Sequence, residues 1–418
     1  MVYSATMANA TVVSGLPPLP AYTLEPIPDL LPWVSDFTVS LFLPHISYWV
    51  VSFIFHMIDI YDLFPAYRLH TPEEISARNH ASRSEVARDV IIEQIIQIFT
   101  TAFLSYTEPV QMTGMENYDV AVWAQRIRVA QRALPTVLGL VGLNAAALAK
   151  SMSASHPLLA GALAGGQYPF VMNTSALGDG AAAATVPAFA SWEIMLAKAI
   201  YWVAVPFVQF WFAVTFMDAW QYFWHRAMHV NRWMYVNWHS RHHRLYVPYA
   251  YGALYNHPVE GFVLDTAGAG LAYKLSFMTP RMSIGFFVFS TIKTVDDHCG
   301  YALPWDPLQR ITSNNAAYHD IHHQSWGIKT NFSQPFFTFW DRLLGTMWTG
   351  DTTLKYARDR DAAARKTAAA AAKAAAEKDE SAEPASSPSD AATPNGGAKA
   401  AKPRKAGVKA SKSKPVNA

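Results

Sequence analysis

Histidine is the residue type in this chain whose number and spacing could carry chemistry. Ten of its fifteen histidines lie between residues 225 and 323, within the segments HRAMH, HSRHH, NHP, DDH and HDIHH. They are His225, His229, His239, His242, His243, His257, His298, His319, His322 and His323. Side chains three and four residues apart lie on one face of a helix, so each of the three larger segments should project its imidazoles in a common direction. Three such faces could converge around metal ions.

Imidazole binds iron, zinc, copper and nickel as the neutral base. A catalytic zinc ion usually takes three protein ligands and an open position, so ten histidines fit two ions better than one. Zinc has no redox chemistry, whereas a pair of iron ions can activate O₂ for attack on an unactivated C–H bond. Any one histidine pair could instead cap a helix or lie on the surface, but three segments beside an apolar span favour ligation. The pattern predicts two iron ions, which zinc could replace in the isolated protein.

Acidic residues near these histidines are candidates for orienting the imidazoles, because a metal-bound imidazole usually donates its second N–H to an acceptor such as a carboxylate. The candidates for this role are Asp218, Asp296, Asp297 and Asp320. Cys299 follows His298, but ten histidines already satisfy the centre, so a buried apolar role is expected for it. The histidines without cluster spacing are interpreted as structural: His45, His56, His70, His80 and His156.

The elements that position this centre should lie in a membrane. Hydrophobic residues make up 51% of the chain and charged residues 15%, against about 25% charged residues in average soluble proteins. The single cysteine excludes an intrachain disulfide and a cysteine-based zinc site. The N-terminus has no basic segment followed by an apolar one, so targeting should come from internal spans. A lipid bilayer is therefore an expected partner, and no nucleic acid is expected.

Long apolar segments supply the candidate spans. Residues 38–64 and 192–229 are each long enough to cross a bilayer of about 30 Å. Residues 89–106 are a third candidate, with polar side chains facing other helices. Residues 262–277 and 283–294 could be short spanning, re-entrant or interfacial helices. The predicted fold is an all-α, polytopic membrane helical bundle with a histidine-rich metal site facing the cytosol.

The composition changes outside these spans. Residues 1–37 form a Pro-rich arm before a membrane-embedded domain of residues 38–350. Within that domain, residues 107–191 form a long insertion whose Gly- and Ala-rich part is interpreted as a loop. Residues 351–418 form a basic, Ala- and Lys-rich tail. Residues 355–380 of it favour a helix, and the tail as a whole is predicted to be disordered and solubilising, or to bind anionic lipid.

The histidine order HX3H, HX2HH and HX2HH, with NHP between the last two, resembles that of the fatty acid hydroxylase and sterol desaturase superfamily of membrane di-iron enzymes. Residues 239–261, 292–305 and 314–346 are similar to its sphinganine C4-hydroxylase branch, which forms phytosphingosine. The resemblance covers roughly residues 47–97 and 216–346.

The resemblance implies that all ten clustered histidines bind two iron ions in an O₂-dependent monooxygenase. The implied substrate is sphinganine or the long-chain base of dihydroceramide, hydroxylated at C4. The implied location is the endoplasmic reticulum membrane, with the metal site on the cytosolic face. No HPGG haem signature of a fused cytochrome b5 domain is present, so electrons from NADPH should arrive through a separate cytochrome b5 and its reductase. Three tyrosines are candidates for positioning the substrate, although interfacial aromatics are common at membranes: Tyr249, Tyr251 and Tyr255.

Other functions stay open at this point. Sterol C4-methyl oxidation and fatty acyl α-hydroxylation belong to the same superfamily, and the physical argument does not exclude them. A different class, a membrane metal-binding or transport protein, would need polar residues distributed through several spans. The histidines instead follow the ends of apolar segments, which favours an enzyme.

Overall fold

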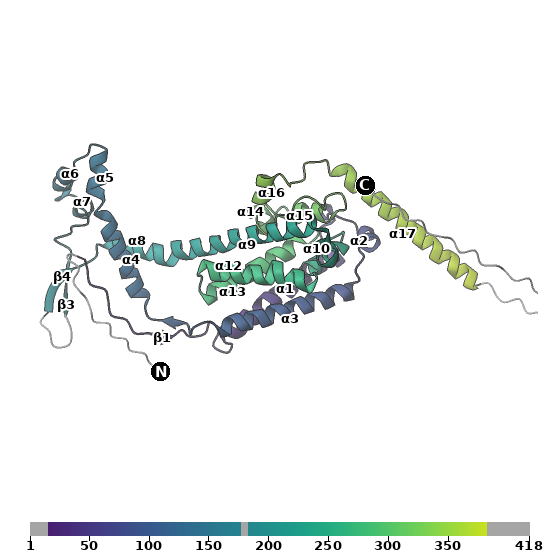
Figure 1. The fold of residues 1–418 in the computed structure, drawn as a ribbon, viewed down its shortest axis with the longest axis horizontal. Coiled ribbons are helices and arrows are strands. Elements are labelled where there is room, and N and C mark those ends of the chain that lie inside the picture. Colours follow the sequence, from purple (N-terminus) through teal and green to yellow (C-terminus); the bar gives the residue numbers. More distant parts are fainter. Residues whose placement is uncertain (1–15, 177–182, 383–418) are drawn as a thin grey trace, which may run out of the picture. The chain divides into compact units, whose positions relative to one another are not determined.

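The computed structural model describes residues 16–176 and 183–382, and these are mostly helical (Figure 1). The chain divides into two compact units, Met1–Thr367 and Ala368–Ala418. Two short antiparallel pairs of strands occur in the first unit. They are β1 (Glu25–Pro26) with β2 (Met112–Thr113), and β3 (Met172–Ala176) with β4 (Ala183–Pro187). The predicted helical class is confirmed, with these strands as the exception.

Two helices of the described residues are long and apolar enough to cross a membrane. One is α1 (Asp36–Ile60), and the other is the continuous helix Ser191–Val230. The second consists of α8 (Ser191–Ala199), the π-helical turn η2 (Ile200–Ala204) and α9 (Val205–Val230). Phe53 on α1 and Phe207 on α9 are both more than half exposed, as expected for helix surfaces that face lipid rather than water. These two candidates match the predicted spans at residues 38–64 and 192–229.

The third predicted span lies in α3 (Arg83–Tyr106), which is not among the helices long and apolar enough to span in the described part of the chain. Its buried polar side chains lower its apolar character and contact neighbouring helices, as predicted. Trp49 Nε1 of α1 donates to Gln94 Oε1 at 2.9 Å, and Thr266 Oγ1 donates to Glu93 Oε1 at 3.2 Å.

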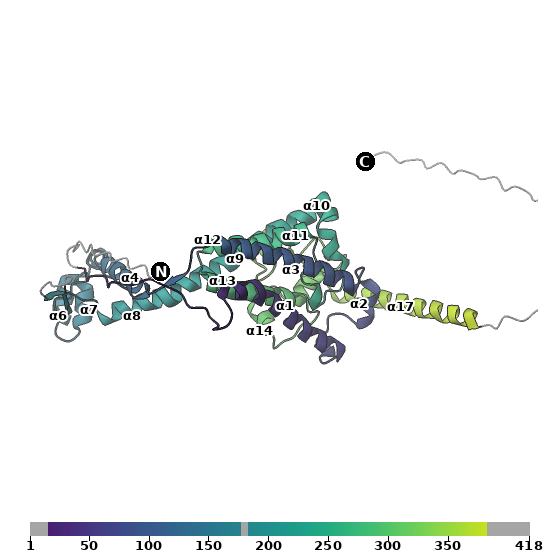
Figure 2. The ribbon, with the colours of Figure 1, turned by 90° about the horizontal axis from the view of Figure 1, so that it is seen from below.

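The membrane bundle is built from contacts of α1 with α13 (Pro280–Asp297) and of α9 with α12 (Gly268–Ser276), which Figures 1 and 2 both show. One apolar core joins α1, α3 and α13, and a second joins α9, α12 and α13. Gly268 permits the close approach of α12 to α9, because a Cβ at this position would lie 2.6 Å from Trp220 Cδ1. The two short predicted helices therefore pack inside the bundle.

The insertion at residues 107–191 is more structured than predicted. It contains α4 (Glu116–Gln131), α5 (Leu134–Leu140), α6 (Ala145–Met152) and α7 (Pro157–Leu163), followed by the β3–β4 hairpin. The Gly- and Ala-rich part predicted as a loop supplies this hairpin, and its residues 177–182 lie outside the described residues. Arg128 of α4 forms a buried ion pair with Glu193 of α8, which explains how the insertion is attached.

The short elements that surround the histidines are η1 (Pro65–Tyr67), α2 (Pro72–Arg78), α10 (Arg232–Asn237), η3 (His239–Arg244), η4 (Ala250–Gly252), α11 (Pro258–Gly261), η5 (Phe262–Ala267), α14 (Pro307–Ile311), α15 (Ala316–His323) and α16 (Phe339–Leu344). Of these, η1, η3 and η4 are 3₁₀ turns and η5 is π-helical.

Part of the chain after residue 350 is helical. Residues Thr353–Ala382 form α17, as the composition of residues 355–380 favoured. Lys366 Nζ of α17 donates to Ala77 O of α2 at 2.6 Å, so the helix starts against the first unit. Disorder of residues 383–418 stays a prediction, because they lie outside the described residues.

Candidate metal centre

Four elements bring nine of the ten clustered histidines together. They are the last two turns of α9 with His225 and His229, η3 with His239, His242 and His243, the residue after α13, His298, and α15 with His319, His322 and His323. Local capping fixes the path between them. The Asn231 side chain accepts from Trp233 N, which ends α9 and starts α10, and the Asn315 side chain accepts from Tyr318 N at the start of α15.

The imidazoles form two groups. The first contains His225, His229, His239, His243 and His322, and the second contains His242, His298, His319 and His323. Within each group the candidate ligand atoms all lie within 4.8 Å of one another. The prediction that each segment faces one direction is wrong for HSRHH and HDIHH, which contribute to both groups. Consecutive side chains point about 100° apart on an α-helix and about 120° apart on a 3₁₀ turn, so the adjacent pairs His242–His243 and His322–His323 divide between the groups.

Ring nitrogens point at one another in both groups. In the first, His239 Nε2 lies 3.1 Å from His225 Nε2 and 2.7 Å from His229 Nε2. In the second, His319 Nε2 lies 3.0 Å from His298 Nε2. Neutral imidazole has one N–H, so these contacts cannot all be hydrogen bonds.

The opposite ring nitrogens show which tautomer is present. Five imidazoles place Nδ1 between 2.7 and 3.2 Å from a backbone carbonyl oxygen: His225 at Phe332, His242 at Tyr255, His298 at Thr294, His322 at Thr330 and His323 at Leu245. A carbonyl oxygen only accepts, so each Nδ1 donates its proton and Nε2 keeps a lone pair. The Nε2 atoms are therefore oriented as ligands.

Burial keeps these rings neutral. It lowers the pKa of His239, His242 and His298 to about 3, and neutral imidazole is the form that binds metals. His322 Nε2 is buried and has no hydrogen-bond partner among the described residues. Converging lone pairs without protons repel one another unless a cation lies between them. The two groups therefore fit two transition-metal ions.

His257 is not in either group. It is partly exposed, and its Nδ1 accepts from Val259 N at 3.2 Å, where it caps α11. The spacing of NHP relative to the other segments predicted ligation, but a histidine before a proline is well suited to a helix N-cap. We therefore propose nine ligands rather than ten.

The four predicted aspartates bond to groups other than the clustered imidazoles. Asp218 accepts from Phe336 N and Phe337 N at 2.9 and 3.1 Å, and Asp296 accepts from Gln309 Nε2 at 2.8 Å. Asp297 pairs with Lys293, and Asp320 contacts His70. The expected direct bonds are absent from the described contacts because carbonyl oxygens take that role for five of the nine rings.

Glu260 is the carboxylate that does contact a clustered ring. It lies on α11, is 1% exposed, and pairs with His239 Nδ1. Sequence reasoning missed it, although the signal was present. Glu260 follows His257 by three residues, which is capping-box spacing, and the cap brings its carboxylate back toward the histidines.

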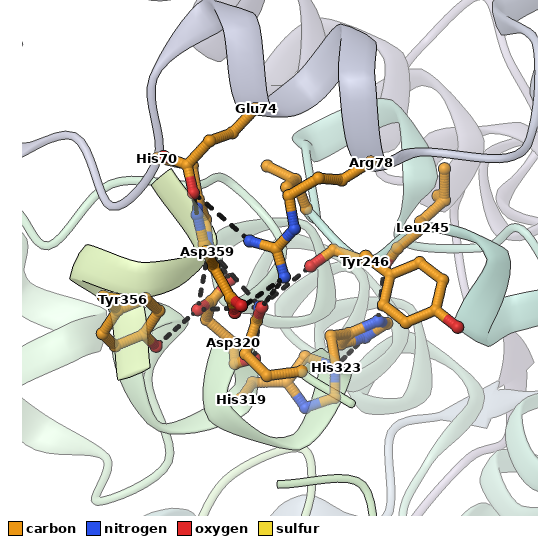
Figure 3. A network of polar contacts seen from close by, with 12 residues as sticks. His70, Glu74, Arg78, Leu245, Tyr246, His319, Asp320, His323, Tyr356 and Asp359 are labelled. Carbon is orange, nitrogen blue, oxygen red and sulfur yellow. Dashed lines mark hydrogen bonds and ion pairs between the residues drawn. The ribbon is translucent and has the colours of Figure 1, made fainter. Parts of the chain in front are cut away.

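Asp320 instead belongs to a buried polar network that holds α15 (Figure 3). His70 Nε2 lies 2.9 Å from Asp320 Oδ1, and Tyr356 Oη donates to Asp320 Oδ2 at 2.6 Å. Burial alone would lower the pKa of His70, but the carboxylates of Asp320 and Glu74 raise it to about 9. His70 thus has the structural role expected of it, since it fixes α15 between α2 and the first turns of α17.

Comparisons with known proteins agree with this site. A family model described as fatty acid hydroxylase matches residues 210–346, which contain all nine grouped histidines. The chain is 42% identical over 331 residues to sphingolipid C4-hydroxylase SUR2 of Saccharomyces cerevisiae, covering 79% of this chain and 77% of that protein. The chain belongs to the fatty acid hydroxylase family. This hydroxylase is also 38% identical over 345 residues to sphingolipid C4-hydroxylase sur2 of Schizosaccharomyces pombe, covering 81% of this chain and 97% of that protein.

A shorter match reaches a higher identity. Over 138 residues the hydroxylase is 62% identical to sphinganine C4-monooxygenase 1 of Arabidopsis thaliana, covering 33% of this chain and 53% of that protein. No solved structure matches the chain. The resemblance inferred from the histidine motifs is thus confirmed, and the chain is an enzyme.

One cavity in the described part of the hydroxylase, of about 260 Å³, is lined by Tyr249 and Tyr251 but by none of the nine grouped histidines. Tyr255, the third predicted substrate residue, is buried and donates to Glu85 Oε1 at 3.0 Å. A cavity of about 30 Å³ is lined by four grouped histidines, and a neighbouring cavity of about 100 Å³ lies among the bundle helices. The cavity lined by the grouped histidines is therefore smaller than the one lined by Tyr249 and Tyr251.

The metal content of the hydroxylase tests the two-group geometry. Protein purified from iron-replete cells without chelators should carry two transition-metal ions per chain, because each group has enough imidazoles for one ion. Inductively coupled plasma mass spectrometry against protein concentration measures this ratio. A ratio of one would show that one group is not a metal site.

Proposed function

We propose that this hydroxylase adds a hydroxyl group to C4 of a sphingoid long-chain base, with O₂ as oxidant and two iron ions as cofactor. The observation that carries the proposal is that a cavity lined by imidazoles of both groups shares lining residues with a second cavity among the bundle helices. The named activities of the relatives, sphingolipid C4-hydroxylase and sphinganine C4-monooxygenase, support this choice of substrate.

Two iron ions held by the nine imidazoles would supply the redox chemistry with O₂ that an unactivated C–H bond requires. The protein's own contribution is to orient the ligands and to position the lipid. Carbonyl oxygens hold five rings through Nδ1, and Glu260 holds His239, so the lone pairs stay aimed inward. The apolar bundle around the cavities limits access of water to the reacting carbon.

The reaction inserts one oxygen atom of O₂ into the C4–H bond and reduces the other to water, which requires two electrons and two protons. We propose that NADPH supplies the electrons through cytochrome b5 and its reductase. We also propose residence in the endoplasmic reticulum membrane with the metal centre facing the cytosol. The position of His225 and His229 at the end of the candidate span Ser191–Val230 supports a site at the membrane surface.

Product analysis tests the proposed reaction. Microsomes containing the hydroxylase, supplied with sphinganine, NADPH, cytochrome b5 and its reductase, should form 4-hydroxysphinganine. Under ¹⁸O₂, mass spectrometry should find one heavy oxygen atom in the product. Microsomes with the His322→Ala variant serve as the control. Label from water, or oxidation of a sterol methyl group in preference to sphinganine, would contradict the proposal.

A further inference from the structure

The two smaller cavities share part of their walls. Gln221, Asp265, Thr294 and Pro335 line both of them. The lining of one cavity includes histidines of both groups, such as His239 and His298. The other lies among the bundle helices and is lined by apolar side chains, such as Leu104, Met217 and Phe287, together with polar ones. Asp265 is therefore the one acidic side chain among the four residues that line both of these cavities.

Asp265 differs from the other acids that line the metal-side cavity. Glu260 is paired with His239, and Asp297 is paired with Lys293. The hydrogen bonds to Asp265 among the described residues come from neutral amides, Gln221 Nε2 at 2.9 Å and Asn256 Nδ2 at 3.2 Å. Its side chain thus has a fixed orientation and no cationic partner in this part of the chain. A carboxylate away from bulk water needs such a partner.

The backbone is also irregular at this position. Asp265 lies in the π-helical turn η5, between α11 and α12. Within this turn the backbone carbonyl of Val263 accepts a hydrogen bond from a side chain, since Trp220 Nε1 donates to Val263 O at 2.8 Å. Single π-helical turns interrupt helices mostly at functional sites, because they displace one side chain from the regular helical surface. In η5, the side chain of Asp265 lies on the wall of both smaller cavities.

We propose that Asp265 binds the protonated amino group of a free long-chain base. The inference rests on the proposed function, and names which form of the substrate the site takes. In sphinganine the amine is on C2, separated from C4 by C3 alone. An amine held at Asp265 keeps C4 in the cavity that the histidines line, while the hydrocarbon chain extends into the apolar cavity. An N-acylated base has a neutral amide in place of the cation and loses the charge-assisted bond.

Steady-state kinetics of Asp265→Asn test this assignment. Asparagine keeps the size of the side chain and an acceptor for Gln221, but loses the charge. We expect KM for sphinganine to rise about tenfold or more, with kcat within about threefold of the unmodified enzyme. KM for dihydroceramide should rise by less than about threefold. The matched control is Glu93→Gln, which removes a buried carboxyl group close to η5 that lines neither cavity; it should leave both KM values within about threefold.

A binding measurement decides the inference independently of turnover. Sphinganine should raise the thermal unfolding temperature of the detergent-solubilised enzyme, and Asp265→Asn should lose most of this shift while Glu93→Gln keeps it. Equal shifts in Asp265→Asn and the unmodified enzyme, or equal KM changes for the two substrates, would overturn the assignment. If the unmodified enzyme forms no C4 product, the proposed function fails, and the thermal shifts still report whether Asp265 holds the amine.

Discussion

His298→Ala and His322→Ala should each reduce formation of 4-hydroxysphinganine by at least about a hundredfold. Each substitution removes one imidazole: His322→Ala from the group of five histidines, and His298→Ala from the group of four. Loss of an outer partner of a ligand already costs about 10- to 100-fold, so loss of the ligand should cost more. Turnover per mole of membrane-inserted protein measures the effect, and metal analysis should show less than two ions per chain.

His257→Ala is the matched control for both substitutions. His257 lies in the same histidine-rich region, but its ring caps α11 and is not in either group. Loss of a cap costs about 1 kcal/mol of stability, so turnover per folded molecule should stay within about threefold and metal content should not change. If the His257→Ala enzyme were as inactive as His298→Ala, His257 would be a tenth ligand, contrary to the proposal of nine.

Glu260→Gln should lower turnover or metal affinity by about 10- to 100-fold, the usual effect of losing a partner that orients a ligand. Glutamine keeps the size of the side chain and an oxygen that can accept from His239 Nδ1, but it removes the negative charge that makes the imidazole a stronger ligand. Competition with a chelator of known affinity measures the change in metal binding, and product formation measures the change in turnover.

Asp296→Asn is the control for Glu260→Gln. Asp296 is equally buried, at 1% exposure, and lies two residues before His298 in sequence. Its carboxylate accepts from Gln309 and contacts Cys299 rather than a grouped ring, so the substitution should change chelator competition by less than about threefold. If Asp296→Asn weakened metal binding as much as Glu260→Gln, the contact of Glu260 with His239 would have no special role in metal binding.

The gathering of histidines at one place could be predicted from the sequence for nine of the ten clustered rings, because three segments of helical spacing follow the ends of apolar segments; metal binding by these rings stays a prediction. The division of the rings between two groups could not be predicted. It depends on η3 being a 3₁₀ turn and on the approach of α15 from a segment about eighty residues further along the chain. Spacing within one segment carries no information on which neighbour an imidazole will meet.

The orienting groups were the least predictable part of the site. Backbone carbonyl oxygens such as Phe332 O and Leu245 O cannot be recognised from the residue types in a sequence, because every residue has one. The aspartates nearest in sequence to the ligands were the natural candidates, but tertiary contacts give them other partners. Structure in the insertion at residues 107–191 was missed for a similar reason, because the buried Arg128–Glu193 pair links positions far apart in the chain.

The network around Asp320 also constrains the order of events during biosynthesis. Its partners His70 and Tyr356 lie 250 residues before and 36 residues after it in the chain, and a chain is synthesised from the N-terminus. Both candidate spans, ending at Ile60 and Val230, have therefore left the ribosome before α15 receives its last partner. The contact that completes the network around α15 can therefore form only after both candidate spans have been synthesised.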